Sequence, residues 1–209
     1  MYDTGGYSLK TPASMPGRKV DMAGSAAVIC AINAIATLKA KANVMAIVAA
    51  TDNRIGDGAT VPDDILTAAS GKTIEIISTD AEGRLTLADA VWFAQKEGAK
   101  RVIDTATLTG AMVAALGHAY TGVFTNNPKF LEEFKAVTEL TNEPIWEMPI
   151  SDVYRKELKS KVADITNKGG RLAGASIAAA FIEEFIEKDT EWIHLDIAGT
   201  ASKKEVGAT

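Results

Sequence analysis

Apolar and polar positions follow two different periods along the chain. Short runs of apolar and β-branched residues predict strands at residues 43–50, 73–77, 101–104, 122–125 and 192–197. Apolar positions three and four residues apart predict helices at residues 85–96, 108–116, 128–140, 152–158 and 173–186. Strands that alternate with helices in this way indicate an α/β protein with a mostly parallel central sheet. We see neither repeats nor linkers, which favours one domain over residues 1–209.

The most apolar stretch, residues 22–38, is rich in alanine, and Lys39 and Lys41 follow it closely. It is slightly short for a bilayer and poor in leucine. We therefore predict a helix that is buried in the core rather than a membrane span. This helix would run to about Lys41, with Asp21 as its cap, and Cys30 is expected inside the core.

The next two segments differ in character. Residues 43–50 are a continuous apolar run, which is typical of a strand buried on both faces. Residues 51–64 are rich in aspartate, glycine and proline, and they predict a long loop. Because the aspartates lack the spacing of an EF-hand, we expect a solvated loop rather than a calcium site.

The composition, 47% hydrophobic and 23% charged, is that of a soluble globular protein. With a net charge of -5 and no cluster of lysine and arginine, nucleic acid is not expected as the main partner. The single cysteine excludes an internal disulfide and fits a reducing compartment. The N-terminus is polar and glycine-rich, so a signal peptide is not predicted and a cytoplasmic location is expected.

Two carboxylates lie on the turn that joins the strand at residues 73–77 to the next helix. Asp80 and Glu82 are two residues apart, so both can ligate one hard cation. Arg84 follows, and its planar guanidinium can hold a small anion. A structural interpretation stays open, because Thr79 and Glu82 have the spacing of a capping box, which starts a helix without any metal.

Further charged residues precede this turn. In an open α/β sheet, ligands gather at the carboxyl ends of the strands. If the loops that carry Asp3, Lys10 and Asp21 reach the same edge, four carboxylates would converge there. Such a group cannot be fully ionised without cations, and two divalent ions could both neutralise it and activate a water molecule. With only two histidines in the chain, the site would depend on carboxylates, which suits Mg, Mn or a Zn pair.

Seven segments, in this order along the chain, resemble the leucyl aminopeptidase family, the two-metal aminopeptidases of the cytosol. They are DTGGYSLK (3–10), KVDM (19–22), SGKT (70–73), TDAEGRL (79–85), TATLTGA (105–111), NKGGR (167–171) and HLDIAGTA (194–201). TDAEGRL resembles the signature of the family. The resemblance implies a catalytic domain with a three-layer, phosphorylase/hydrolase-like α/β fold.

The resemblance also implies a role for each candidate residue. The metal ligands, for two Mn or Zn ions, would be Asp3, Asp21, Asp80 and Glu82, with Asp3 and Glu82 as candidates for bridging both ions. Lys10 would polarise the scissile carbonyl and stabilise the oxyanion. Arg84 would hold a bicarbonate ion that acts as the general base. The substrate-binding turn would consist of Thr107, Leu108 and Gly110.

The reaction implied is hydrolysis of the first peptide bond of a peptide with a free N-terminus. Members of the family assemble as homo-hexamers. They carry a metal-binding lysine just before the position of Asp3, a separate N-terminal domain and a last strand beyond Val206. The chain is therefore expected to be a catalytic domain shortened at both ends. An inactive metal-binding fragment and a non-enzymatic interaction module are the alternatives.

Arg18 stands where the family usually has a methionine that lines the side-chain pocket. We expect its positive charge to weaken metal binding and activity towards leucine substrates. The side chain could instead turn to solvent or favour an acidic N-terminal residue. Ala23 and Cys30 stand where the family would have glycine at close helix packing.

Overall fold

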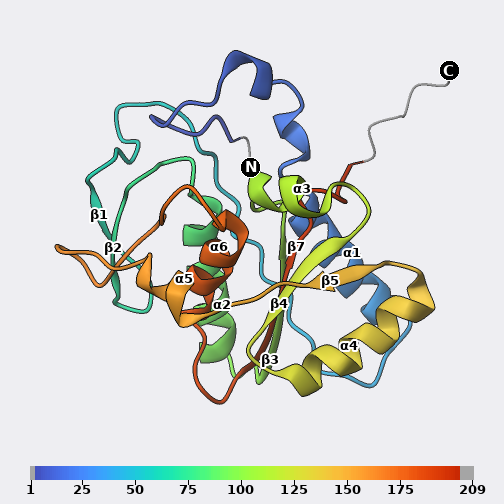
Figure 1. Ribbon diagram of the computed structural model, residues 1–209. Helices are drawn as coiled ribbons and strands as arrows, with labels where there is room; N and C mark the ends of the chain where they lie inside the picture. Colours follow the sequence, from blue (N-terminus) through green and yellow to red (C-terminus); the bar gives the residue numbers. More distant parts are fainter. Residues whose placement is uncertain (1–2, 203–209) are drawn as a thin grey trace, which may run out of the picture.

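A four-stranded sheet runs through the middle of the computed structural model, which describes residues 3–202 (Figure 1). Its order is β3-β7-β4-β5. The strands are β3 (Arg101–Ala106), β4 (Thr121–Thr125), β5 (Ile145–Glu147) and β7 (Glu191–Asp196). β3 pairs with β7 in parallel, and so does β4 with β5, whereas β4 and β7 are antiparallel. The predicted α/β class with a largely parallel sheet is confirmed.

Helices cover both faces of this sheet (Figure 1). One side carries α2 (Gly83–Lys96), α5 (Asp152–Lys156) and α6 (Gly174–Glu183), and the other carries α1 (Ala23–Thr37) and α4 (Pro128–Thr141). Every residue of α6 from Ala175 to Ile182 is buried, because this helix is apolar on all sides and packs among α2, α3 (Gly110–Leu116) and α5. The three-layer arrangement follows from this.

A second, smaller sheet was not predicted. It has the order β1-β2-β6, where β1 (Ile65–Thr67) is antiparallel to β2 (Thr73–Glu75), and β6 (Ile165–Thr166) is parallel to β2. The predicted strand at residues 73–77 is therefore real but belongs to this sheet. The turn that carries the acidic residues extends from the small sheet to α2 on the side of the large one.

Residues 43–50, predicted as a buried strand, lie in none of the strands that the structure describes. Most of them are exposed, and Val44 is 48% exposed. They line the same cavity as β3, which is an edge strand, yet they do not pair with it. Outside the named strands, residues 3–202 contain one isolated β-bridge, which joins Asn53, just beyond this segment, to Asp3 in parallel. An apolar strand is buried only where neighbours cover it, and the prediction assumed neighbours that this arrangement lacks.

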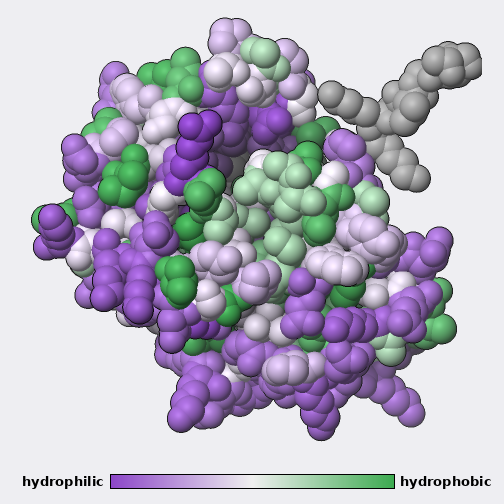
Figure 2. Space-filling view, in the orientation of Figure 1, coloured by the Kyte–Doolittle hydropathy of each residue, from purple (hydrophilic) through white to green (hydrophobic). Residues whose placement is uncertain are grey.

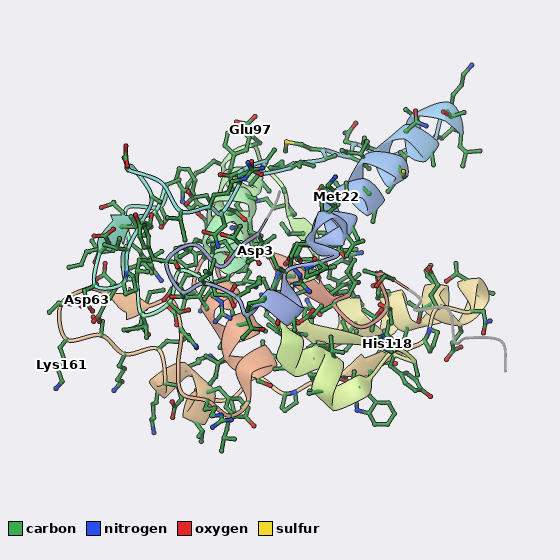
Figure 3. The ribbon with its side chains drawn as sticks, turned by 90° about the horizontal axis from the view of Figure 1, so that it is seen from above. Asp3, Met22, Asp63, Glu97, His118 and Lys161 are labelled. Atoms are coloured by element: carbon green, nitrogen blue, oxygen red, sulfur yellow. The ribbon has the colours of Figure 1, made fainter. Side chains whose placement is uncertain are left out.

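The prediction that α1 is a buried core helix is wrong. Residues 18–37 are long and apolar enough to cross a membrane by length and composition, but only 6% of this window is buried. Gly24 is the helix's one buried residue among those described, and a Cβ there would lie 2.1 Å from the carbonyl oxygen of Thr105. Seen from above, α1 runs outward from the body of the molecule, with Met22 near its inner end (Figure 3). Cys30 is exposed rather than packed.

Candidate metal centre and active site

Three of the predicted metal ligands come together at one point. Asp3, Asp80 and Glu82 each offer one ligand oxygen, and these oxygens lie within 4.8 Å of one another. Asp3 comes from the N-terminal loop and lies near the centre of the molecule as seen from above (Figure 3). The other two belong to the turn before α2, so segments about 80 residues apart in sequence build one acidic cluster.

Glu82 lies in an environment that penalises its negative charge. Burial, and next the charge of Asp3, raise the pKa of Glu82 to about 8. Its Oε2 atom is buried without a hydrogen-bond partner among residues 3–202. A buried, unpartnered carboxylate oxygen is costly unless a cation neutralises it. This oxygen fits a metal ligand.

Lys10 supplies a positive charge to the same cluster. Its Nζ atom lies 2.9 Å from Oδ2 of Asp3 and donates a short hydrogen bond to Oδ1 of Asp80. Burial alone would lower the pKa of Lys10, but the hydrogen bonds and charges of the two aspartates outweigh it and raise the pKa. Lys10 is therefore protonated at neutral pH.

The N-terminal loop is fastened to the acidic turn by Thr79. Its hydroxyl donates to the carbonyl oxygen of Gly5 at 2.6 Å and accepts from the backbone N–H of Ser8 at 2.7 Å. Gly5 has φ of 87°, and a Cβ there would lie 2.9 Å from Asp80. The capping-box interpretation is wrong, because Thr79 bonds to this loop, and α2 begins at Gly83, after Glu82, without a side-chain cap from the described residues.

Asn53 is a positioning residue that the sequence did not suggest. Its Nδ2 atom donates to Oδ1 of Asp3 at 2.9 Å and to the carbonyl oxygen of Thr79, also at 2.9 Å. One amide thus fixes a candidate ligand relative to the acidic turn. It lies in the loop at residues 51–64, where nothing in the sequence marks it.

Asn167 holds the turn from the opposite side. Its side chain is fully buried. The amide Nδ2 donates to the carbonyl oxygen of Ser78 at 2.7 Å, and Oδ1 accepts from the backbone N–H of Ile77 at 2.8 Å. Asn167 is the first residue of the NKGGR segment, and its amide positions the acidic turn.

We expect Asn167→Ala to lower the free energy of unfolding by about 2–4 kcal/mol, because it leaves buried backbone groups of the turn unpaired. Urea denaturation monitored by circular dichroism measures this. Asn33→Ala is the matched control, since Asn33 is an exposed residue of α1 and alanine is the better helix former. Equal losses in the two variants would contradict the positioning role of Asn167.

Asp21, the fourth predicted ligand, lies outside the cluster formed by the other three. It does not cap α1 either, whose first flanking residue is Met22. Its Oδ1 atom accepts from the hydroxyl of Thr107 at 2.8 Å, and its Oδ2 atom lies 3.3 Å from Nη1 of Arg18. Asp21 thus links the predicted substrate turn to Arg18.

The turn with Thr107, Leu108 and Gly110 connects β3 to α3. Asp196, buried at the end of β7, holds it in place. This carboxylate accepts from the backbone N–H of Leu108 at 3.2 Å and from the hydroxyl of Thr109 at 2.6 Å. The surface over α3, which Gly110 begins, is hydrophobic (Figure 2). The turn therefore has a rigid backbone beside an apolar surface.

Arg84 is buried at the start of α2 and lines the same cavity as the acidic cluster. Burial lowers the pKa of Arg84 to about 10, although the charges of Glu82 and Asp196 oppose the shift. Its Nε atom has no hydrogen-bond partner within the described part of the chain. A buried guanidinium with an unused donor fits a small anion.

The two histidines do not join the cluster. His194 is fully buried, and its Nδ1 atom lies 2.6 Å from Oδ1 of Asp104, whose other oxygen accepts from the indole N–H of Trp192 at 2.7 Å. The ring of His118 donates through Nδ1 to the carbonyl oxygen of Gly199 at 2.6 Å. Both side chains are therefore engaged in hydrogen bonds within the fold rather than in the acidic cluster.

Comparison with known proteins gives one consistent result. A family model described as "Cytosol aminopeptidase family, catalytic domain" matches residues 1–209. A "Probable cytosol aminopeptidase" of Clostridium tetani is 52% identical over 201 residues, and one of Fusobacterium nucleatum is 54% identical over 201 residues. Each alignment covers 96% of this chain but 42% of the relative. The chain therefore spans less than half the length of these relatives.

Proposed function

Because the chain belongs to the cytosol aminopeptidase family, we propose that it provides the catalytic part of a metal-dependent aminopeptidase. The substrates would be peptides with a free N-terminus, and the bond hydrolysed would be the first one. A cytoplasmic location and assembly as a homo-hexamer are part of the same proposal. They rest on the family, while the chemistry can be argued from the site.

The observation that carries the proposal is the unpartnered Oε2 of Glu82 inside the cluster with Asp3 and Asp80. We assign these three residues, together with Asp21, as the ligands of two divalent ions, Mn or Zn. When bound, such ions would lower the pKa of a water molecule and polarise a carbonyl group. Carboxylates are suitable ligands for both metals.

The remaining groups of the site would act on the peptide. Lys10, protonated and held between Asp3 and Asp80, would donate to the carbonyl oxygen as its negative charge develops. Arg84 would hold bicarbonate through its guanidinium, whose Nε donor is unused, and the bicarbonate would serve as general base. The turn with Thr107, Leu108 and Gly110, fixed by Asp196, would receive the amino end of the peptide.

A second candidate function is a metal-binding fragment without turnover. Asp21 lies outside the cluster of the other three acids, and the chain covers 42% of its relatives. Both candidates share the metal site and differ in catalysis.

One experiment separates the two. Leucine p-nitroanilide is incubated with the chain in the presence of Mn²⁺ or Zn²⁺, and metal binding is measured in parallel by calorimetry. We expect binding and hydrolysis, both lost on chelation. Binding without hydrolysis supports the inactive fragment, and the absence of both contradicts the metal centre.

A further inference from the structure

Arg18 is a cation at the edge of the candidate active site that the proposed mechanism does not use. It opens the short 3-10 helix η2 (Arg18–Val20), directly after Gly17, whose φ is 87°. The turn brings Arg18 to the same side as Asp21, three residues later. Arg18 lines the cavity that also contains Asp3 and Lys10.

The guanidinium of Arg18 uses little of its hydrogen-bonding capacity. Its ion pair with Asp21 is a single contact of 3.3 Å through Nη1. The Nε atom is buried and has no partner among the residues that the structure describes. Arginine binds carboxylates best through two parallel hydrogen bonds. Asp21 does not form such a pair, because only its Oδ2 atom contacts Arg18, while its Oδ1 atom accepts from Thr107 at 2.8 Å.

The position of these groups relates Arg18 to the substrate. Asp21 has Arg18 on one oxygen and Thr107 on the other, so the guanidinium lies one carboxylate away from the turn proposed to receive the amino end of the peptide. A peptide whose amino end lies at this turn would therefore have its first residue close to Arg18.

We propose that Arg18 makes this site selective for peptides whose first residue is acidic. The inference rests on the proposed function and adds the class of substrate. A carboxylate on that residue would supply the pair of acceptors that Arg18 lacks. A leucine side chain in the same place would instead cover donors without pairing them, which costs free energy.

The charge of the loaded site favours the same choice. Two divalent ions would balance the four carboxylates of Asp3, Asp21, Asp80 and Glu82, and the bicarbonate proposed at Arg84 would balance that arginine, so the positive charges of the neighbouring Lys10 and Arg18 would remain in excess. An acidic side chain is attracted to such a site, and a basic one is repelled. Weaker metal binding, expected from the charge of Arg18 alone, is a separate effect, because it would lower the activity towards all substrates alike.

The test compares two substrates that differ only in charge. The p-nitroanilides of glutamate and glutamine have nearly the same shape, so the ratio of their kcat/KM values reports recognition of the carboxylate. We expect a ratio of about 10 or more in the parent chain, as for one charge-assisted hydrogen-bonded pair. Arg18→Met should lower the ratio to about 1 or below. Lys19→Met is the matched control, because Lys19 is the exposed neighbour on the same turn and its loss changes the net charge equally.

A ratio of 1 or less in the parent, or a ratio that Arg18→Met leaves unchanged, overturns the inference. If the leucine, glutamate and glutamine substrates are all not hydrolysed, the proposed function fails for this chain. The role of Arg18 is then tested by the binding of substrate analogues instead of by hydrolysis. Calorimetry with Mn²⁺ present compares the α-amides of glutamate and glutamine. Tighter binding of the glutamate amide that depends on Arg18 supports selectivity. Equal affinities, or no binding of either amide, reject it.

Discussion

Replacing Glu82 by glutamine is expected to abolish catalysis and to weaken binding of Mn²⁺ or Zn²⁺ by at least about 100-fold. Glutamine keeps the size of the side chain but removes the negative charge that the ions would neutralise. In the structure, Oε2 of Glu82 is buried and has no other partner among residues 3–202, so nothing else there explains its charge. Calorimetry measures the affinity, and leucine p-nitroanilide the activity.

The same substitution should have the opposite effect on stability in the presence of a chelator. The pKa of Glu82 is raised from 4.5 to about 8, so ionisation of this residue destabilises the folded chain. This loss of folding free energy is absent below about pH 4.5 and reaches its full size above about pH 8. Glu82→Gln should therefore raise Tm relative to the parent, by a few degrees near pH 8 and less near pH 5.

Glu97→Gln is the matched control for both measurements, because Glu97 is an exposed residue at the other end of α2. If Glu82→Gln bound the metal as tightly as the parent, Glu82 would not be a metal ligand, and the acidic turn would have a structural role only. If the Tm of Glu82→Gln at pH 8 in chelator is lower than that of the parent, Glu82 stabilises the fold through its contacts, and its ionisation does not destabilise it.

The sequence predicted those elements whose pattern is set locally. The helix predicted at residues 128–140 is α4 (Pro128–Thr141), where Asn127 caps the first turn and proline follows it. The strand predicted at residues 192–197 is β7 (Glu191–Asp196). In each case, residues within one turn or one strand are sufficient to define the element.

Burial was harder to predict, because it depends on residues far away in sequence. The apolar run at residues 43–50 and helix α1 have the composition of core elements, yet both are largely exposed in the described structure. Periodicity shows which face of an element is apolar, but it does not show what covers that face. The same limit applies to Cys30, for which the apolar pattern predicts a place in the core but which is exposed in the structure.

The candidate site shows a related division. The acidic residues could be predicted as candidate ligands, because carboxylates that are close in sequence suggest a cation site. The roles of Asn53 and Asn167 could not be predicted, because an amide acquires its role only when the fold brings backbone groups from several segments around it. The positioning role of Asp196 could not be predicted for the same reason, since its partners Leu108 and Thr109 lie almost 90 residues earlier in the sequence.

Lys10→Ala is expected to lower kcat by about 100-fold or more, with a much smaller change in KM. A donor that acts on the developing oxyanion contributes mainly in the transition state, so its removal affects turnover rather than binding. In the structure, the hydrogen bonds and charges of Asp80 and Asp3 outweigh burial and raise the pKa of Lys10. Steady-state kinetics with leucine p-nitroanilide separate the two parameters.

Metal affinity distinguishes this variant from Glu82→Gln. The ammonium of Lys10 contacts both Asp3 and Asp80, so its loss removes a positive charge that competes with cations for these carboxylates. Lys10→Ala should therefore bind Mn²⁺ at least as tightly as the parent while its turnover falls. Lys19→Ala, at an exposed position, controls for the loss of one lysine charge. If Lys10→Ala loses metal affinity, or if only KM changes, Lys10 organises the site or binds substrate and is not the group that stabilises the oxyanion.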